Sequence, residues 1–218
     1  MSYLLRIDSS ASGEASYSRQ VADTFAKDWG GEVITRDLAR NPLSHLDSVS
    51  ITARTTPADQ QTPEQRAAAE LEDDLIEEFL GASAYLFAVP MYNYSMPSVF
   101  KAWLDHIMIP GKTFGMGDAD PASGRPAVLV SARGGGYGPG SPQHGKDFLV
   151  PALEIILGDA LGLDVRTITP ELTYAPIMDP LKHLLPLHET SLAEAHDLAR
   201  RNAADLNRVL TCSVRTEN

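Results

Sequence analysis

A buried strand that runs straight into a polar, aromatic loop constrains this chain more than any other stretch. Residues 84–89 (AYLFAV) are apolar without polar alternation, as is typical of a strand buried on both faces of a parallel sheet. Pro90 ends the strand because proline donates no hydrogen bond to a ladder, and Pro97 suits the first turn of a helix. Ligands bind at the carboxyl ends of parallel strands, so the tyrosine-rich loop between the prolines is predicted to line a ligand site. A plain connector is the alternative, but connectors are usually short and rich in Gly, Asp and Ser.

Four further segments have the composition of strands, and segments of helical periodicity separate them. The predicted strands span residues 3–8, 32–38, 84–89, 126–131 and 164–169. The predicted helices follow each strand, and the last of them spans residues 189–210. This alternation predicts an α/β fold, a doubly wound five-stranded parallel sheet flanked by helices on both faces. With no repeat or linker in the chain, residues 1–210 are predicted to form a single domain and residues 211–218 a C-terminal tail.

Three local patterns refine this prediction. Thr62 is expected to cap a helix, with Pro63 at its first position and Gln65 completing a capping box. Residues 41–63 are polar and are predicted to cross the edge of the sheet, whereas the glycine-rich residues 109–125 are predicted to form a loop or hairpin near the ligand site. One acidic run is predicted to lie on a solvated helix face: Glu70, Glu72, Asp73, Asp74, Glu77 and Glu78.

Charge and cysteine content exclude several classes of partner and site. The net charge of −11 argues against nucleic acid, because phosphate backbones are bound by basic faces. An anionic ligand must therefore be held by backbone N–H groups or a few arginines. The one cysteine, Cys212, excludes an intrachain disulfide framework and a cysteine metal cluster, and the histidines show no metal-ligand spacing. With no apolar run of membrane-spanning length and no signal peptide, a cytoplasmic protein without membrane contact is expected.

Three loops follow the first, third and fourth predicted strands, whose carboxyl ends converge where a mononucleotide would sit. In the first loop Ser10, Ser16 and Ser18 supply hydroxyl groups, and the start of the next helix supplies unpaired N–H groups that favour a phosphate. N-capping alone would account for one of these serines but less readily for three. The second loop offers aromatic and apolar groups to a planar ring, and the third offers Arg133 with three glycines that permit close backbone approach.

These residues resemble the FMN-dependent NADH:azoreductases, also described as NADH:quinone oxidoreductases. The most specific part of the match is Met91-Tyr92-Asn93-Tyr94 with the helix that carries Pro97, Phe100-Lys101 and Trp103-Leu104-Asp105. The serine loop and Arg133-Gly134-Gly135 are weaker signals, and the resemblance runs from about residue 2 to about residue 200. It implies a flavodoxin-like fold and a homodimer, with FMN near the subunit interface. It also implies ping-pong transfer of two electrons from NADH or NADPH through FMN to quinones or azo compounds.

The resemblance also assigns roles to residues by position. Phosphate and ribityl contacts are implied for Ser10, Ser16, Tyr17 and Ser18, and isoalloxazine contacts for Met91, Tyr92, Asn93 and Tyr94. Ala132, Arg133, Gly134 and Gly135 are implied to line the pyrimidine edge. A weaker hypothesis is that Tyr137 and His144 assist hydride transfer, as a Tyr and a His do in related quinone reductases; a surface loop histidine is the alternative.

Two departures from the family pattern affect the site. The family commonly has Ser directly before Arg-Gly-Gly, where this chain has Ala132 and carries Ser131 one residue earlier, so a hydroxyl contact is lost while backbone contacts survive. Near Met116 the family often carries an aromatic residue over the flavin, so acceptor preference does not transfer. Support for the homodimer beyond the resemblance comes only from an apolar helix face around Trp103 and Ile107, which core packing would equally explain.

A flavodoxin-type electron carrier or redox sensor, without hydride-donor turnover, is the alternative function. The tyrosine-rich loop and residues 109–125 favour the enzyme, because they indicate a pocket for a second planar molecule. A low-molecular-weight phosphatase is excluded because the first loop has no cysteine, and a serine hydrolase because the chain has no G-x-S-x-G elbow. The sequence identifies neither the physiological acceptor nor a residue set that would select NADPH over NADH.

Overall fold

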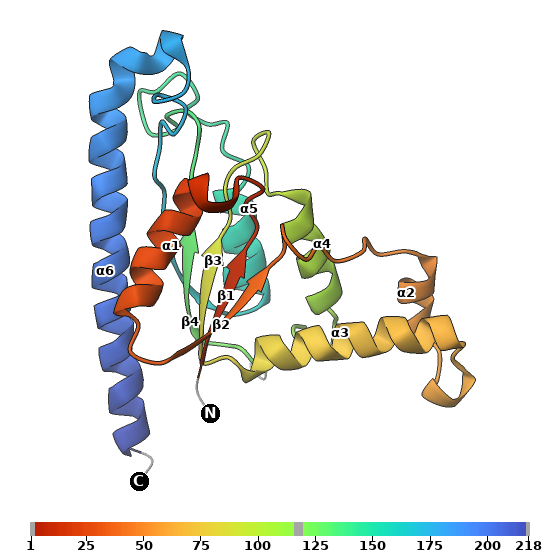
Figure 1. The fold of residues 1–218 in the computed structure, drawn as a ribbon. Coiled ribbons are helices and arrows are strands. Elements are labelled where there is room, and N and C mark those ends of the chain that lie inside the picture. The colour runs from red at the N-terminus through yellow and green to blue at the C-terminus, as the bar shows by residue number, and fades with distance from the viewer. Residues whose placement is uncertain (1–2, 116–119, 217–218) are drawn as a thin grey trace.

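The fold is organised on one sheet of five parallel strands (Figure 1). In a computed structural model, which describes residues 3–115 and 120–216, the strands lie in the order β2-β1-β3-β4-β5. Their bounds are Tyr3–Asp8 (β1), Glu32–Asp37 (β2), Ala84–Ala88 (β3), Pro126–Val130 (β4) and Asp164–Ile168 (β5). The predicted doubly wound parallel sheet is confirmed, and the order reverses direction between β1 and β3, which creates a crevice at their carboxyl ends.

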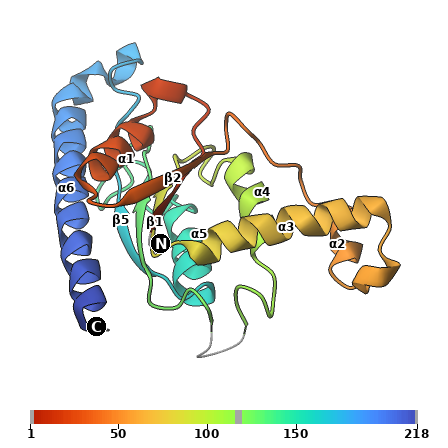
Figure 2. The same cartoon turned by 60° about the horizontal axis from the view of Figure 1, so that its bottom comes forward.

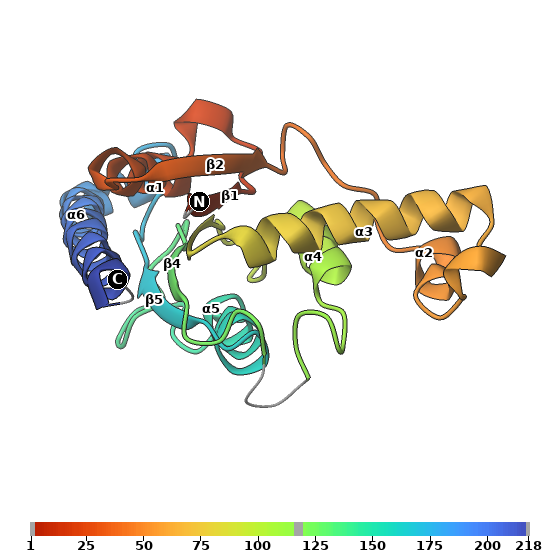
Figure 3. The same cartoon turned by 90° about the horizontal axis from the view of Figure 1, so that it is seen from below.

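Helices cover both faces of the sheet (Figures 1 and 3). One face is covered by α1 (Tyr17–Asp28) and α6 (Leu185–Thr216). The other is covered by α3 (Pro63–Gly81), α4 (Ser98–Ile107) and α5 (Val150–Leu153), which continues as a π-helical segment, η4 (Glu154–Ala160). Because side chains alternate along a strand, the fully buried β3 contributes Leu86 to the α1/α6 core and Phe87 to the α3/α4 core.

Aromatic rings form the centre of the α3/α4 core. The Phe79 and Tyr85 rings are 4.8 Å apart, and Trp103 lies 5.5 Å from Phe100 and 5.9 Å from Phe87. Trp103 and Ile107 are both fully buried here, so the apolar helix face around them belongs to the core of this chain and offers no surface to a second subunit.

Helix starts follow the predicted capping signals. The Thr62 side chain accepts a hydrogen bond from the Gln65 N–H while the Gln65 side chain accepts one from Thr62 N–H, so the capping box at α3 is confirmed. Ser16 caps α1. The last helix begins four residues before the predicted Glu189 and extends to Thr216.

The polar segment 41–63 forms α2 (Ser48–Ala53) and the 3-10 turn η2 (Ala58–Gln60), which lie against the end of α3 that projects beyond the sheet (Figure 2). This segment buries part of the predicted solvated face. Glu72 is only 2% exposed, pairs with Arg54 at 2.7 Å and lies 3.3 Å from His106 Nδ1. The prediction of a solvated face is therefore wrong at Glu72, because residues remote in sequence cover it.

Residues 109–125 do not lie where the sequence placed them. In the described parts, 109–115 and 120–125, Gly124 N–H donates to the Gly162 carbonyl and Arg125 donates to the Leu80 and Ala82 carbonyls. These contacts lie at the amino ends of the strands, opposite the crevice. The prediction that this segment lies near the site of the same chain is therefore wrong. Met116, whose place in the family pattern was noted, lies outside the described residues.

Among the described residues, no helix combines the length and the apolar character needed to cross a membrane.

The buried carboxylate of Glu72 provides a test of this packing. Glu72→Ala leaves Arg54 and His106 in a buried place without their shared partner, and we expect the free energy of unfolding to fall by about 3 kcal/mol. Urea denaturation measures the change. Glu70→Ala, an exposed position on the same helix, is the matched control and should change stability by less than about 0.5 kcal/mol. Equal effects of the two substitutions would contradict the buried position of Glu72.

Candidate functional site

Four segments meet at the carboxyl edge of the sheet because strand pairing continues beyond the strands themselves. Ser9 N–H donates to the Ala88 carbonyl at 3.1 Å, Met91 N–H to the Ala132 carbonyl at 2.9 Å, and Arg133 N–H to the Pro170 carbonyl at 2.9 Å. These bonds bring together residues 9–17, 90–95, 131–143 and 170–178. The first three segments contain the loops that the sequence predicted, whereas the fourth was missed.

The first of two cavities at this edge, here called the serine cavity, has a volume of about 130 Å³. It lies at the N-terminus of α1, a helix of 12 residues, whose first N–H groups have no partner within the helix. Several predicted residues line it: Ser10, Ser16, Tyr17, Met91, Tyr92, Ala132 and Gly134. Ser12, Ala15, Pro90, Thr173, Tyr174 and Ile177 complete the lining. Hydroxyl groups, backbone donors and apolar walls are thus combined in one small volume.

Two predicted residues, Ser18 outside this lining and Tyr92 within it, hold the serine loop through hydrogen bonds. Ser18 is fully buried, and its Oγ lies 3.0 Å from Ser16 Oγ, the N-cap of α1. Tyr92 links the first two loops, since its hydroxyl accepts from Ala11 N–H at 3.0 Å and lies 3.3 Å from Ser10 Oγ. The serine loop is therefore held in place by side chains from two other elements.

Asn93 and Tyr94 form a strained turn. Their φ angles are +49° and +69°, and Tyr92 and Ser95 exchange both backbone hydrogen bonds, at 2.9 and 3.0 Å. This is a two-residue turn of the type that asparagine and glycine favour, but here a tyrosine occupies the second position. Strain of this kind persists where the surroundings impose it, often at ligand sites. The turn places Asn93 in solvent and directs Tyr94 to the second cavity described below.

A charge network lies beneath the serine loop. Arg19 donates to Asp37 at 2.7 and 2.8 Å, to Asp8 at 3.0 Å and to the Ser10 carbonyl at 3.1 Å. Arg6 donates to Asp8 at 3.0 Å and to Asp23 at 2.6 Å. Both guanidinium groups are thus occupied by carboxylates of the same chain. Of the two, Arg19 also fixes the backbone at Ser10.

Arg133 is likewise occupied. Its buried guanidinium pairs with Asp147 at 2.8 Å and with Glu171 at 3.2 Å, and lies 5.6 Å from the centre of the Tyr137 ring. The side chain lines neither cavity. Its backbone N–H is bonded to Pro170, and its carbonyl accepts from Thr173 N–H and Oγ1, both at 3.0 Å. Arg133 therefore holds the glycine loop in shape.

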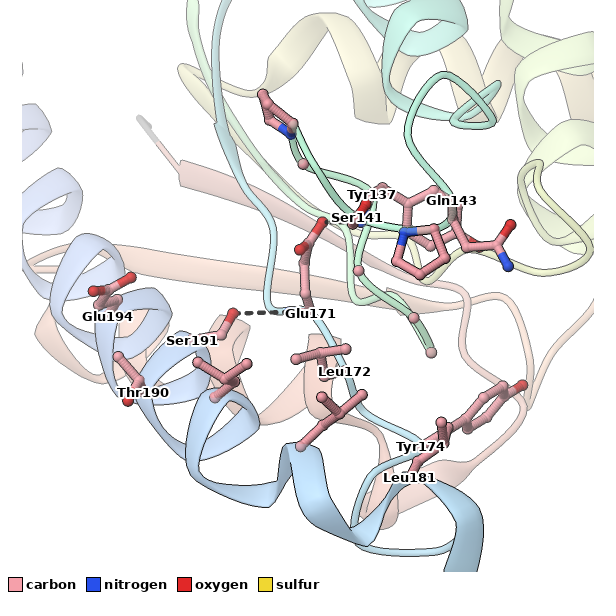
Figure 4. A pocket seen from close by; sticks show the side chains of 18 of the residues that line it. Tyr137, Ser141, Gln143, Glu171, Leu172, Tyr174, Leu181, Thr190, Ser191 and Glu194 are labelled. Carbon is pink, nitrogen blue, oxygen red and sulfur yellow. Dashed lines mark hydrogen bonds between the residues drawn. The ribbon is translucent and has the colours of Figure 1, made fainter.

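The second cavity, here called the leucine cavity, has a volume of about 810 Å³ and lies between residues 134–143, the segment after β5 and the start of α6 (Figure 4). Gly135 and Tyr137 line it, and burial raises the pKa of the Tyr137 phenol, which is therefore protonated at neutral pH. His144 is exposed and lies outside both linings, so the structure does not bring it together with Tyr137 at either cavity.

Sequence reasoning missed Thr173, Tyr174 and Ile177, which line the serine cavity from the segment after β5. Tyr174 N–H donates to the Gly134 carbonyl at 3.2 Å, and a Cβ built on Gly134 would lie 2.4 Å from Tyr174 Cε2. Only glycine permits this contact. The available signal was that β5 also ends at the carboxyl edge and is followed by a polar and aromatic stretch, Glu171 to Tyr174.

Two departures noted in the sequence have clear positions. Ala132 lines the serine cavity, and its carbonyl accepts from Met91 N–H. Ser131 is fully buried and lies outside both linings. Over residues 3–115 and 120–216, no group of three or more His, Cys, Asp or Glu is placed to hold a metal ion.

Comparisons with known proteins agree with this geometry. A family model described as a flavodoxin-like fold matches residues 2–174. A Streptomyces coelicolor protein named FMN-dependent NADH:quinone oxidoreductase is 42% identical over 97% of this chain and 98% of its own length. A Frankia casuarinae protein of the same name is 40% identical over 94% of this chain and 100% of its own. The solved structure of an FMN-dependent NADH-azoreductase from Bacillus anthracis, in complex with FMN, has a TM-score of 0.76 at 21% identity, and the match covers 93% of this chain and 100% of that one, which shows the shared fold.

The charge network predicts how stability depends on pH. Hydrogen bonds from Arg19, and from the N–H groups of Arg40 and Ala39, lower the pKa of Asp37, so the folded state holds this proton less tightly than the unfolded chain does. The ionised Asp37 carboxylate therefore adds to the free energy of unfolding above the unfolded pKa of about 3.9. This stabilisation is lost as the pH falls through the lower pKa of the folded state.

Asp37→Asn should accordingly lower the free energy of unfolding at pH 6, and the difference from the parent protein should shrink below about pH 4. Urea denaturation across this range measures it. Asp59→Asn removes the same charge from an exposed position in η2 and should leave the pH profile unchanged. A difference for Asp37→Asn that stays constant with pH would contradict the prediction.

Proposed function

Because the chain belongs to the FMN-dependent NADH:quinone oxidoreductases, a family with the flavodoxin-like fold, we propose that it catalyses the reduction of quinones by NADH. The observation that carries this proposal is the serine cavity at the N-terminus of α1, which shares two lining residues, Gly134 and Tyr174, with a larger cavity. An anionic cofactor and a second molecule can thus lie next to one another at the carboxyl edge of the sheet.

The donor set fits FMN in an acidic protein. A phosphate group needs hydrogen-bond donors, and Ser10, Ser16 and the first N–H groups of α1 supply them without a free cation. We assign the phosphate and the ribityl chain to these groups with Tyr17, and Ser18 to the support of Ser16. Because these groups bind the phosphate, Arg6 and Arg19 are free to pair with carboxylates of the chain itself.

Apolar and backbone groups suit the flat ring system. We assign Met91, Tyr92 and Tyr94 to contacts with the isoalloxazine, whereas Asn93, which is exposed and lines neither cavity, forms the strained turn that positions Tyr94. The backbone from Ala132 through Arg133 to Gly135 is assigned to its pyrimidine edge. Gly134 fits this role because no Cβ stands between the backbone and a neighbouring ring. The side chain of Arg133 acts from behind by fixing the loop.

When bound, FMN would supply the redox chemistry between NADH and the acceptor, and water would supply the protons that the reduced acceptor needs, so no protein group has to act as an acid or base. The chain's own groups bind, orient and exclude water. Tyr137 keeps its proton at neutral pH and can offer an O–H donor at the wall of the leucine cavity. The hypothesis that His144 assists rests on the family resemblance alone.

The finer features of the proposal follow the same resemblance. We propose a ping-pong order, azo compounds as further acceptors, and a homodimer. A second subunit has a surface available beside the site, since Phe148 and Ile177 are among the exposed large apolar side chains and Phe148 N–H donates to the Tyr94 carbonyl. A cytoplasmic location is part of the proposal, since a single cysteine suits a reducing compartment.

Anaerobic titration tests the function directly. The purified protein, reconstituted with FMN, should be yellow, lose its visible absorbance on addition of NADH without oxygen, and regain it with a benzoquinone. A ping-pong order requires that the two half-reactions, bleaching by NADH and recovery with the quinone, each proceed without the other substrate present. A protein that does not bind FMN would overturn the proposal, and a yellow protein that NADH leaves unbleached would favour the electron carrier.

Ser16→Ala tests the phosphate assignment. Loss of a hydrogen bond to a charged group costs about 1.5 kcal/mol, so we expect FMN affinity to fall about tenfold. Quenching of flavin fluorescence during titration measures it. Thr62→Ala removes a similar N-cap from α3, far from the cavity, and should cost similar helix stability while leaving FMN affinity unchanged. If both variants bind FMN as the parent does, the Ser16 assignment is wrong.

A further inference from the structure

The leucine cavity is large enough for a ligand of its own. Its volume of about 810 Å³ falls within the range of about 300–1,000 Å³ that small-molecule sites occupy. Its apolar wall comes from the segment after β5 and the start of α6: Leu172, Leu181, Leu184 and Leu187. Figure 4 shows Leu172 and Leu181 on this side and Tyr137, Ser141 and Gln143 on the opposite side. The cavity thus combines one aliphatic wall with one aromatic and polar wall.

Two residues connect this cavity to the serine cavity. Gly134 and Tyr174 line both, and the Tyr174 ring lies against Gly134 while 54% of the residue is exposed. A ligand in the leucine cavity therefore lies next to the ring of any cofactor held between Met91 and Gly134. A molecule whose reactive head reached that ring would have its remaining atoms in the leucine cavity.

The charges of the lining restrict what can enter. In the lining described, the charged side chains are Glu171 and Glu194, with no Lys, Arg or His among the lining residues. The guanidinium of Arg133, which pairs with Glu171, lies outside the lining and is also paired with Asp147. A sulfonate or carboxylate in the cavity would meet the Glu194 carboxylate and would find no cation among the lining residues to bind it, which is unfavourable. Uncharged molecules incur no such penalty.

The polar wall offers hydrogen bonds instead of charge. Ser141 Oγ and Gln143 Oε1 are buried atoms that have no hydrogen-bond partner in the described structure. Buried polar atoms in that state favour a ligand or water that completes their hydrogen bonds. Both residues line the leucine cavity. The Ser141 hydroxyl can donate to an oxygen atom of an uncharged ligand, whereas Gln143 Oε1 is an acceptor that a water molecule or a ligand O–H would complete.

We propose that the leucine cavity binds the aliphatic side chain of the electron acceptor, and that the preferred acceptor is an uncharged quinone with an apolar tail. This inference rests on the proposed function and specifies its substrate class. The leucines would hold the tail while the quinone ring lies at the cofactor. Anionic aromatic acceptors would be poor substrates because the Glu194 carboxylate repels them and no lining cation binds them.

Leu187→Asp is the most direct test, because Leu187 is 59% exposed and its replacement leaves the core intact. We would compare kcat/KM of the FMN-loaded enzyme for two acceptors, a dimethoxy-methyl-benzoquinone and the same compound with a decyl tail. The parent enzyme should prefer the decyl compound by about tenfold or more, and Leu187→Asp should remove most of that preference while leaving the tail-free quinone unaffected. Calorimetric titration with the decyl compound should show a similar loss of affinity.

Leu198→Asp places the same charge at an exposed position of α6 outside the cavity lining and should keep the preference. Glu194→Gln should raise kcat/KM for an anthraquinone sulfonate several-fold.

The outcomes separate this inference from the function on which it rests. If NADH reduces neither quinone through the parent enzyme, the proposed function fails. If the tail-free quinone is reduced and the decyl compound is no better a substrate, the function stands and the inference fails. If Leu187→Asp instead lowers turnover of both quinones equally and changes the molar mass measured by light scattering, the cavity is a contact between subunits, and the inference is likewise overturned.

Discussion

The site depends on strand pairing that continues past the ends of the strands. The hydrogen bonds between neighbouring strands continue beyond the ends of β1, β3, β4 and β5, at residues 9, 91 and 133. The loops therefore leave the same edge of the sheet side by side. Each loop carries its own chemistry, with hydroxyls in the first, aromatic rings in the second and glycines in the third. None of these loops could hold a ligand alone, because each presents one side of the cavity. The continued strand pairing places the three loops next to one another, so together they line one site.

Local neutralisation allows an acidic chain to keep an anion site. With a net charge of −11, long-range attraction for a phosphate is absent, and the two arginines nearest the serine loop are paired with Asp8, Asp23 and Asp37. Such pairs add little field outside the protein, but they fix geometry, because Arg19 also binds the Ser10 carbonyl. Affinity at this site would therefore come from short-range donors at the start of α1, which act only on a group that fits among them.

The parts that the sequence predicted correctly are those decided by local physics. The strands, the capping box at Thr62 and the burial of β3 each follow from the character of a few neighbouring residues. The errors arose where distant segments decide the outcome. Glu72 has the local pattern of a solvated position but is covered by residues 41–63. Residues 109–125 have a ligand-loop composition, but their described parts, 109–115 and 120–125, pack at the opposite edge. Tyr174 was missed because its position depends on Gly134, 40 residues earlier, having no side chain.

The contact between Gly134 and Tyr174 lies between the cavity proposed for the cofactor and the cavity proposed for the acceptor. If the cofactor carries the redox chemistry, selection among acceptors must come from groups that touch the acceptor and leave the cofactor undisturbed. Among the residues that the structure describes, the serine cavity and the leucine cavity share only these two. Changes in α6 or in residues 137–143 can therefore alter acceptor preference with little effect on cofactor binding. Gly134 itself is the exception. A side chain there would displace the Tyr174 ring and would alter both cavities at once.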